Sequence, residues 1–396
     1  MDSYRYHQRG VSSDKAEVHK ATSFLDKGLF ENTFCKILPD VYTDNDDMCL
    51  ISHSDTVGTK GVLAYLTWKE LGEMSVWERL AQDAMVMNID DMLASGCTGP
   101  FVVSNTITRN KGLIPGDVIA AIIRGNQDFV DMLNENGIEC HYAGGETADV
   151  GDVVRTIDNG ITASALYPKK EVLKIQIKPG HSILGLASYG CSTYEASYNS
   201  GISCNGLTSA RHDVLHSDYK KYRETYDPSM KQNLVYSGSR YLGDEVDVNG
   251  KSMLIWDLLT SPTRTFAPVL KKIIQELNSH ITGIVHNTGG AHTKVLNFAP
   301  DVEIIKDQLL PVPPVFKLIQ AESGASWKEM YQVFNMGTRM ELYFSDEKAA
   351  EDARSIAEEF KIDAGLIGKV SSCGPDKPAG AHIKHGSDWL FYPAGK

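Results

Sequence analysis

The chain has 396 residues and a formal net charge of −12 at pH 7, and this length predicts two folding domains. The acidic balance argues against a nucleic-acid surface, and no apolar run approaches the roughly 18 residues of a membrane span. Seven cysteines without a CxxC pair, and a first segment without an apolar signal core, favour reduced thiols in a cytoplasmic protein.

The first half of the chain alternates strand-like and helix-like patterns. Strands are predicted over residues 48–53, 101–108, 138–143 and 157–166. Helices are predicted over residues 14–27, 61–71 and 76–95, and from Pro115-Gly116-Asp117 onward. The segment 167–180 is rich in proline and charge, and it places the domain boundary between residues 172 and 173.

The second half repeats the alternation with more irregular sequence. Residues 189–206 are predicted to be a long loop, and the polar residues 216–252 an insertion. Strands are predicted over residues 182–187, 281–286, 340–344 and 366–370, and helices over residues 264–277 and 346–360. Both domains, 1–172 and 173–396, are therefore expected to mix strands and helices.

The motif Asp55-Thr56-Val57-Gly58-Thr59-Lys60 follows an apolar strand and precedes a helix. Gly58 permits a tight turn, while Thr59 and Lys60 offer groups that bind phosphate. The glycine spacing is not that of a Walker loop. A polar turn with a helix cap is the alternative, and the motif by itself favours that alternative.

Two adjacent carboxylates, Asp90 and Asp91, lie inside the predicted helix 76–95. Aspartate is unfavourable within a helix, and metal binding would explain its presence. Alternatively, Asp90 faces solvent and Asp91 pairs locally. The residues leave both interpretations open.

A second glycine motif, Gly144-Gly145-Glu146-Thr147-Ala148-Asp149, follows the predicted strand 138–143. Paired glycines permit a ligand to approach the backbone, and Glu146 could reach a metal ion. A glycine turn with an exposed acid explains the motif equally well.

Three small-residue turns in the second half could bind phosphate through backbone N–H groups. They are Asn205-Gly206, Pro262-Thr263-Arg264 and Thr288-Gly289-Gly290. Arg211 and Arg264, like Lys60, could add positive charge. Each turn taken singly is more typical of a structural element.

Taken in this order, the motifs resemble those of the AIR synthetase superfamily and, within it, the phosphoribosylformylglycinamidine cyclo-ligases. The resemblance runs from Tyr6 and Gly10-Val11 to the last strands. It includes the motifs at 55 and 144, the Asp90-Asp91 helix, the three turns of the second half, and Met330-Tyr331 with Phe334-Asn335-Met336-Gly337.

The resemblance implies an α+β fold of two domains. The N-terminal domain would carry a mixed sheet with helices, bind ATP and Mg²⁺ and form a homodimer through that sheet. The C-terminal α/β domain would cover the site. The implied reaction closes the ring of formylglycinamidine ribonucleotide with ATP, giving aminoimidazole ribonucleotide, ADP and phosphate.

The resemblance also implies roles for individual residues. Lys60 and Asp91 would be catalytic, and Asp55, Asp91 and Glu146 would hold Mg²⁺. ATP would contact Asp55, Gly58, Thr59, Lys60, Gly144, Gly145, Glu146 and Thr147. The ribonucleotide would contact Asn205, Gly206, Arg264, Thr288, Gly289 and Gly290.

The chain departs from the family pattern at four places. Thr56 replaces a glycine, Asp90 replaces an asparagine, Ser203 replaces a histidine, and residues 28–38 contain one glycine where several are usual. Two other functions stay open: another ATP-using member of the superfamily, such as a small-molecule kinase or a selenophosphate synthetase, or a nucleotide-binding dimer without catalysis. Selenophosphate synthesis would need a reactive cysteine, for which Cys35 is the candidate.

Overall fold

The first half of the chain builds a five-stranded sheet of order β1-β2-β5-β3-β4, in which only β3 and β4 run parallel. The computed structural model describes residues 5–11, 21, 22, 24–374 and 378–395. The strands are β1 (Ile37–Pro39), β2 (Met48–Thr56), β3 (Phe101–Arg109), β4 (Cys140–Asp149) and β5 (Ile157–Pro168). The helix predicted over 14–27 lies largely outside the described residues.

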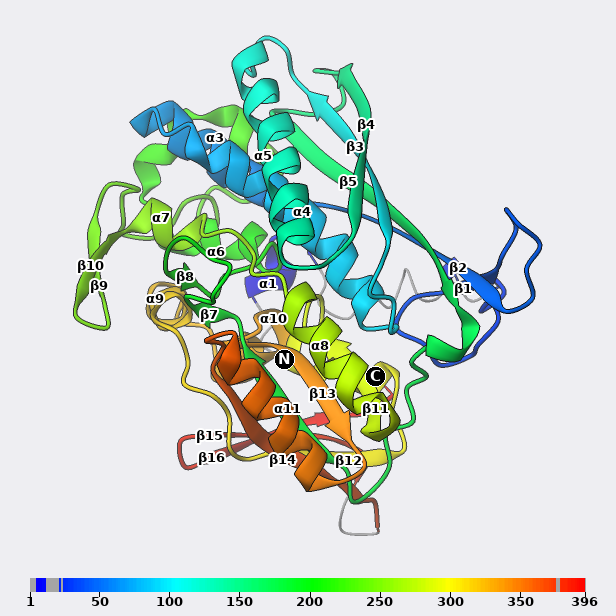
Figure 1. Cartoon of the computed structure of the whole chain (residues 1–396). Helices are drawn as coiled ribbons and strands as arrows, with labels where there is room; N and C mark the ends of the chain where they lie inside the picture. Colours follow the sequence, from blue (N-terminus) through cyan, green and yellow to red (C-terminus); the bar gives the residue numbers. More distant parts are fainter. Residues whose placement is uncertain (1–4, 12–20, 23, 375–377, 396) are drawn as a thin grey trace.

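Three helices cover one face of this sheet: α3 (Lys60–Leu71), α4 (Ser75–Leu93) and α5 (Gly116–Glu135). Figure 1 shows all three on the same side of β3, β4 and β5. The opposite face carries small polar side chains, with hydroxyl pairs Ser52–Ser164 at 2.9 Å and Ser54–Thr162 at 3.0 Å. Val102, paired in register with Ser164, is 48% exposed on that open face.

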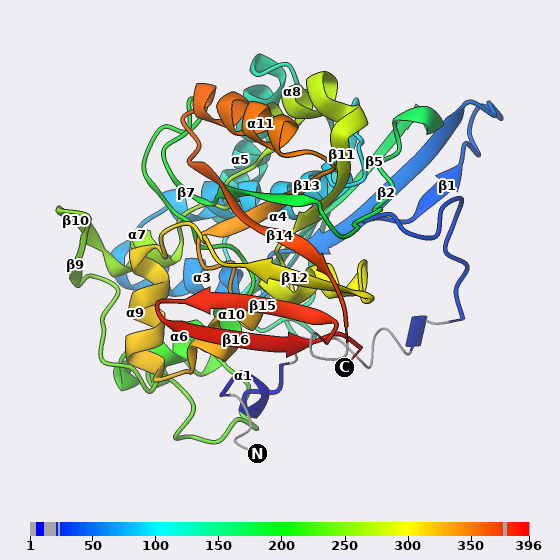
Figure 2. The same cartoon turned by 90° about the horizontal axis from the view of Figure 1, so that it is seen from below.

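The second half builds a seven-stranded sheet of order β11-β13-β6-β14-β12-β15-β16. Its strands are β6 (Ser182–Ala187), β11 (Ile281–His286), β12 (Val302–Lys306), β13 (Thr338–Phe344), β14 (Ala364–Ser372), β15 (Gly380–His385) and β16 (Asp388–Pro393). Helices α8 (Ala267–Leu277) and α11 (Glu347–Glu359) lie together over one face of it (Figure 2). The chain therefore has the two-domain α+β architecture that the resemblance implied.

The other described helices and strands are short and are separated by loops. They are α1 (Arg5–Gln8), η1 (Lys169–Glu171), β7 (Tyr189–Gly190), β8 (Asn199–Ser200), α6 (Leu207–Val214), η2 (Ser217–Lys221), η3 (Arg223–Thr225), β9 (Glu245–Val248), β10 (Lys251–Leu254), α7 (Ile255–Leu259), η4 (Asn278–His280), η5 (Ala291–Asn297), α9 (Pro314–Ser323) and α10 (Trp327–Val333). The predicted insertion 216–252 thus holds two 3₁₀ turns and most of the hairpin β9-β10. Among the described helices, none is long and apolar enough to span a membrane.

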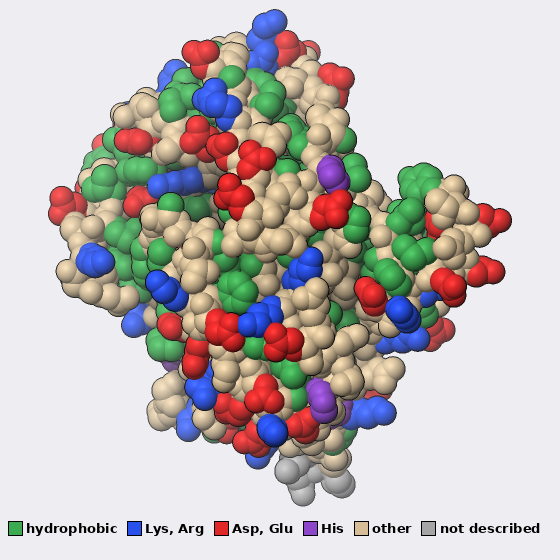
Figure 3. Space-filling view, viewed as in Figure 1, with side chains coloured by type: hydrophobic (Ala, Val, Ile, Leu, Met, Phe, Trp, Pro, Cys, Tyr) green, Lys and Arg blue, Asp and Glu red, His purple; other side chains and the backbone are tan. Residues whose placement is uncertain are grey.

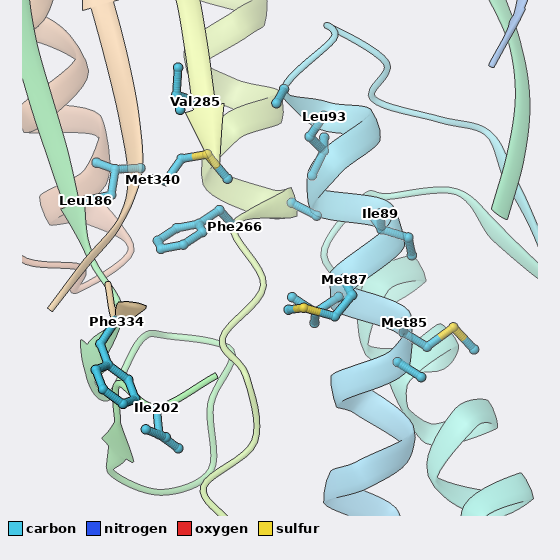
Figure 4. Packing of buried hydrophobic residues seen from close by; sticks show 14 of the residues in the cluster. Met85, Met87, Ile89, Leu93, Leu186, Ile202, Phe266, Val285, Phe334 and Met340 are labelled. Carbon is cyan, nitrogen blue, oxygen red and sulfur yellow. The ribbon is translucent and has the colours of Figure 1, made fainter. Parts of the chain in front are cut away.

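Helix α4 is the central element of the fold. It packs on β2 and β5 of the first sheet, on α5, and on α8 of the second half. Its apolar residues Met87, Ile89 and Leu93 are buried, and Figure 4 shows Phe266, at the start of α8, between Met340 and this helix. The four polar residues Asp83, Asn88, Asp90 and Asp91 of the same helix are also buried.

The first described residues pack on the second half of the chain. Arg5 Nη1 donates to the Ser323 carbonyl at 2.8 Å, and Arg9 Nη1 contacts Asp213 Oδ2 at 2.7 Å. The predicted boundary between residues 172 and 173 falls in the segment between β5 and β6. By their contacts, however, residues 5–9 lie against domain 173–396 and not in the first domain.

Candidate active site

The loop 55–60 joins β2 to α3, as predicted, but its lysine points into the protein. Lys60 is 1% exposed, and its Nζ donates to Asp83 Oδ1 at 2.7 Å and to the Ser261 carbonyl at 2.6 Å. Asp83 Oδ1 also accepts from the Thr263 N–H at 2.8 Å. We call Lys60, Asp83, Ser261 and Thr263 the Lys60 cluster. It joins the two halves, in place of the phosphate contact expected of Lys60.

The remaining residues of the loop stay near solvent. Asp55 is exposed, and its Oδ1 accepts from the Thr56 N–H at 2.7 Å. Gly58 adopts φ +52°, the left-handed turn for which glycine was predicted. The Thr59 hydroxyl contacts the Thr208 hydroxyl on α6 at 3.0 Å, a second contact between the halves.

The adjacent carboxylates of α4 have different surroundings. Asp90 is fully buried; it accepts from the Thr265 hydroxyl at 2.7 Å and the Phe266 N–H at 3.0 Å. Burial raises the pKa of Asp90 to about 7, against the opposing effect of Arg339. Asp90 therefore fixes the start of α8, and the interpretation that it faces solvent is wrong.

Asp91 is bound by two histidines from different halves of the chain. Its Oδ1 lies 2.6 Å from His286 Nδ1, and its Oδ2 lies 3.4 Å from His53 Nε2. His53 Nδ1 contacts Asn88 Oδ1 at 2.9 Å. We call Asp91, His53, His286, Thr288 and Lys294 the Asp91 cluster, because Lys294 donates to the Thr288 hydroxyl at 2.5 Å and acts electrostatically on Asp91.

The charges of the cluster can be assigned from these contacts. Burial raises the pKa of Asp91, but Lys294, His286 and His53 outweigh it and hold the pKa at about 2. Burial lowers the pKa of His286 to about 4, although Asp91 opposes this change. Asp91 is thus ionised and His286 neutral near pH 7. With its Nδ1–H directed at Asp91, His286 keeps a free lone pair on Nε2, which is buried without a hydrogen-bond partner.

The expected three-carboxylate site for one Mg²⁺ is not formed. Across the sheet, Thr56 pairs with Gly160, Gly160 with Thr106, and Thr106 with Glu146. The order β2-β5-β3-β4 therefore separates Asp55 from Glu146 by three strand spacings, about 14 Å.

Asp55 precedes Thr56, which is aligned with Glu146 across the sheet. Because successive side chains of a strand point to opposite faces, the side chains of Asp55 and Glu146 lie on opposite faces of the sheet. An ion that holds its oxygens at about 2.0–2.1 Å cannot bridge them within one chain. Among the described residues, no group of three or more His, Cys, Asp or Glu side chains could hold a metal ion. Asp55 and Glu146 are therefore not brought together within one chain, and the sharing of one ion by Asp55, Asp91 and Glu146 stays a prediction.

The paired glycines have a structural explanation. A Cβ atom on Gly145 would lie 1.8 Å from the Asn105 carbonyl oxygen of β3, and Gly144 adopts φ +82°. Glycine is required at 145 because two backbones touch there. Glu146 is exposed, and its Oε1 accepts from the Thr147 N–H at 3.0 Å.

The three turns predicted to bind the ribonucleotide are not equivalent. The turn Thr288 to Gly290 directly follows His286 and so lies within the Asp91 cluster. Asn205-Gly206 precedes α6, where Gly206 has φ +81° and packs on Phe334. Asn205 Oδ1 is buried without a partner.

Arg264 is fully buried and donates to Glu195 and to the carbonyls of Ala187 and Tyr189. Its guanidinium therefore fixes the chain before and after β7, and the structure does not direct it at a ligand.

Two histidines of the Asp91 cluster were missed by the sequence reasoning. His286 directly precedes Asn287-Thr288-Gly289-Gly290, and His53 lies two residues before Asp55. A histidine next to a motif was the available signal. Their shared contact with Asp91 depends on packing between halves of the chain, which residue spacing does not show.

The comparisons with known proteins agree with the geometry. Residues 37–166, from the start of β1 to within β5, match the family model of the AIR synthase related protein, N-terminal domain. The phosphoribosylformylglycinamidine cyclo-ligase of Staphylococcus carnosus is 29% identical over 83% of this chain and 81% of its own length. The enzyme of that name from Thermococcus kodakarensis is 26% identical over 92% and 95%.

Solved structures share the fold at low identity. A HypE–HypF complex contains a chain that matches 96% of this one over 99% of its length, with a TM-score of 0.58 and 14% identity. Thermotoga maritima PurL complexed with ADP matches 93% of this chain over 46% of its length, with a TM-score of 0.51 and 12% identity. The chain is thus similar over most of its length to phosphoribosylformylglycinamidine cyclo-ligases, and its residues 37–166 match the AIR synthase related N-terminal domain.

Proposed function

We propose that this chain is an ATP-dependent cyclo-ligase that converts formylglycinamidine ribonucleotide to aminoimidazole ribonucleotide in purine biosynthesis. ATP transfers its γ-phosphoryl group to the formyl amide oxygen, and ADP leaves. The ribosyl-bearing nitrogen then forms a bond to the formyl carbon, the carbon–oxygen bond breaks, and phosphate departs with the oxygen. The nitrogen loses one proton.

The observation that carries the proposal is the Asp91–His286 contact. The contact joins Asp91 of α4, in the first half, to His286, which directly precedes the Thr288–Gly290 turn of the second half. The Asp90-Asp91 helix and this turn are both motifs of the resemblance. A neutral imidazole that is held by an ionised carboxylate is a suitable general base. His286 Nε2 would accept the proton that the closing ring releases, and the Thr288–Gly290 turn would position the ribonucleotide.

ATP enters the proposal through relatives. The curated relatives carry the name of a cyclo-ligase, and a structural neighbour is complexed with ADP. The phosphates of ATP would then lie beside the loop 55–60, in contact with Thr59, with residues 144–147 of β4, or with both. Mg²⁺, which takes about one or two protein carboxylates beside phosphate oxygens, would use Asp55 or Asp91 and not share Glu146 with them in the same chain.

A homodimer is part of the proposal, and the open face of the first sheet supports it. That face carries hydroxyl rows and the exposed Val102 without a covering helix, and a second copy would cover it. The seven free cysteines fit a reducing, cytoplasmic location. In Figure 3 acidic and basic side chains are intermingled on the face in view, which supports a small-molecule substrate and no nucleic-acid partner.

Cys35 weakens one of the competing functions. Selenophosphate synthesis would need a reactive thiolate. The Cys35 thiol is buried and contacts the Asp91 carbonyl at 3.2 Å; burial, with Asp91 next, raises its pKa well above the usual range. A thiol in this state is inert.

The test is ADP release by the purified protein with formylglycinamidine ribonucleotide, ATP and Mg²⁺. Substrate-dependent ADP together with one equivalent of aminoimidazole ribonucleotide is expected. Thiamine monophosphate and selenide serve as alternative acceptors in parallel reactions. ADP release with either of these and none with the ribonucleotide would exclude the cyclo-ligase function. Nucleotide binding without turnover of any acceptor would point to a non-catalytic dimer.

A further inference from the structure

A cavity lies beside α6, where the two halves of the chain meet. None of the residues of the Asp91 cluster lines it. It has a volume of about 370 Å³, within the size range of small-molecule sites. Three arginines and four threonines line it together with other residues: Arg9, Arg155, Arg211, Thr59, Thr156, Thr208 and Thr225. We call this cavity the arginine pocket. The resemblance implies no role for any of the three arginines.

Arg211 is a buried cation without an acidic partner. It is 3% exposed, and its Nη1 donates to the Thr225 carbonyl at 2.7 Å and to the Tyr236 hydroxyl at 2.9 Å. No ion pair among the described residues includes it, and its Nε is buried without a hydrogen-bond partner. A buried charge with an unsatisfied donor is unfavourable unless a ligand supplies the missing partner.

The other two arginines increase the positive charge at the same place. Arg9 is 5% exposed and pairs with Asp213, which also binds Arg5, and Arg9 Nη2 is buried without a partner. Arg155 lies at the rim with its side chain 48% exposed. Burial lowers the pKa of Arg211, the Tyr236 hydroxyl opposes this change, and repulsion from Arg9 and Arg155 adds to it. No carboxylate among the described residues forms an ion pair with Arg211.

The acidic residues of the lining, Glu224 and Asp227, have partners other than Arg211. Glu224 accepts from the Tyr65 hydroxyl at 2.7 Å. Asp227 is exposed, binds Ser229, and lies 3.8 Å from Arg155. Neither forms an ion pair with Arg211. The threonine hydroxyls of 59 and 208, 3.0 Å apart, add neutral donors on the opposite side of the domain junction.

We propose that the arginine pocket binds a phosphate group, either as inorganic phosphate or as the phosphate of a small sugar ester. Guanidinium groups present planar forks that match phosphate oxygens, and hydroxyls can complete the shell. The pocket shares Thr59 with the proposed ATP site, but its three arginines have no part in the proposed ring closure, so the proposal does not rest on that reaction.

The experiment is isothermal titration calorimetry of the full chain with sodium phosphate in buffer containing EDTA, so that no metal site contributes. Ribose 5-phosphate is titrated in parallel, and sodium acetate is the control anion. Saturable binding of phosphate or of ribose 5-phosphate is expected. The ligand that binds more tightly shows whether the pocket takes inorganic phosphate or the phosphate of a sugar ester. No saturable binding of either at concentrations up to about 20 mM would overturn the proposal, as would equal binding of acetate.

Two variants locate the site. Arg155→Glu, at the exposed rim, is expected to weaken binding at least tenfold, and Arg211→Gln to abolish it. The matched control is Arg223→Glu, the same charge change on an exposed residue that adjoins the lining residue Glu224 but is not itself part of the lining. It should leave affinity unchanged. If Arg155→Glu binds as the wild type does, or if both glutamate variants lose affinity equally, the pocket is not the site. Thermal unfolding confirms that Arg211→Gln is folded.

Discussion

The Lys60 cluster and the Asp91 cluster both join the two halves through residues of α4, but they differ in their access to solvent. Lys60 is 1% exposed and Asp83 fully buried, and their ion pair is sealed. In the Asp91 cluster, His53 has a side chain 24% exposed, and His286 keeps a buried Nε2 without a partner. Lys60, a residue of the predicted motif, is thus part of the domain junction, while His286, which lies outside the motifs, keeps a ring nitrogen without a partner.

The largest effect is expected for Asp91→Asn. The amide removes the negative charge that holds the His286 tautomer, so turnover should fall by about 10²–10⁴-fold, the range of general acid–base catalysis. ADP release with the ribonucleotide measures it. The matched control is Asp90→Asn on the neighbouring residue, which should lower thermal stability more than turnover. Wild-type rates in Asp91→Asn would remove the distinction between the two clusters.

Lys60→Met should act on stability. It leaves Asp83 as a buried charge without its cation, and breaking such a pair costs about 3–5 kcal/mol. Urea unfolding measures the loss, with Lys69→Met on the exposed end of the same helix as the control. A variant with unchanged stability and abolished ATP turnover would restore the phosphate-binding role predicted for Lys60.

The pH dependence of stability should report on His286. Its folded pKa of about 4 lies below the ordinary value of 6.5, so the unfolded chain binds one more proton between these values. The stability that neutral His286 contributes is present above pH 6.5 and is lost as pH falls towards 4. At pH 5 the loss amounts to about 2 kcal/mol.

Asp90 has the opposite sign. Its pKa of about 7 is raised, so its contribution is present below pH 3.8 and is lost as pH rises through 7. The two effects partly cancel in the stability of the wild type as a function of pH. The effect of His286 is therefore obtained by comparing the free energy of unfolding of the wild type with that of His286→Asn at each pH. Between pH 7 and pH 5 the wild type should lose about 2 kcal/mol more stability than the variant. Parallel profiles would mean that His286 titrates normally.

The smallest effect is expected at Gly144, which is compared with its neighbour Gly145. Gly145→Ala should cost about 3 kcal/mol, because its Cβ would overlap the Asn105 carbonyl and the strands would have to separate. In Gly144→Ala the added Cβ would have no atom within 4 Å. The cost is that of an alanine in the left-handed backbone conformation, about 1 kcal/mol of stability. Melting temperatures compare them. Equal losses would argue that the glycines are needed for a ligand and not for strand packing.

Sequence patterns predicted most of the regular elements near their observed bounds. Residues 182–187 and 281–286 match β6 and β11, and the helix predicted over 76–95 is α4 at Ser75–Leu93. Apolar periodicity is strong in these segments because each buries one face. The strands β12, β15 and β16 and the helices α9 and α10 were missed. They lie in short, polar or proline-rich stretches where that periodicity is weak.

The site was predicted less completely than the fold. The sequence pointed to Asp91 and to Thr288-Gly289-Gly290, and these meet in one cluster. It also pointed to Lys60 and Arg264, which are buried in ion pairs with Asp83 and Glu195. Residue type and motif order do not state whether a charged side chain faces a ligand or an acid of the other half.

The sequence by itself determined the family resemblance, the mixed architecture of each half and the positions of the carboxylates, since these follow from local periodicity and short motifs. Tertiary structure decided the rest. Strand order placed Asp55 and Glu146 about 14 Å apart on opposite faces. Packing of the second half on α4, chiefly through α8, brought His286 at the end of β11 to Asp91, across 195 positions of the chain. Such contacts depend on which buried surfaces meet, and no single segment encodes that.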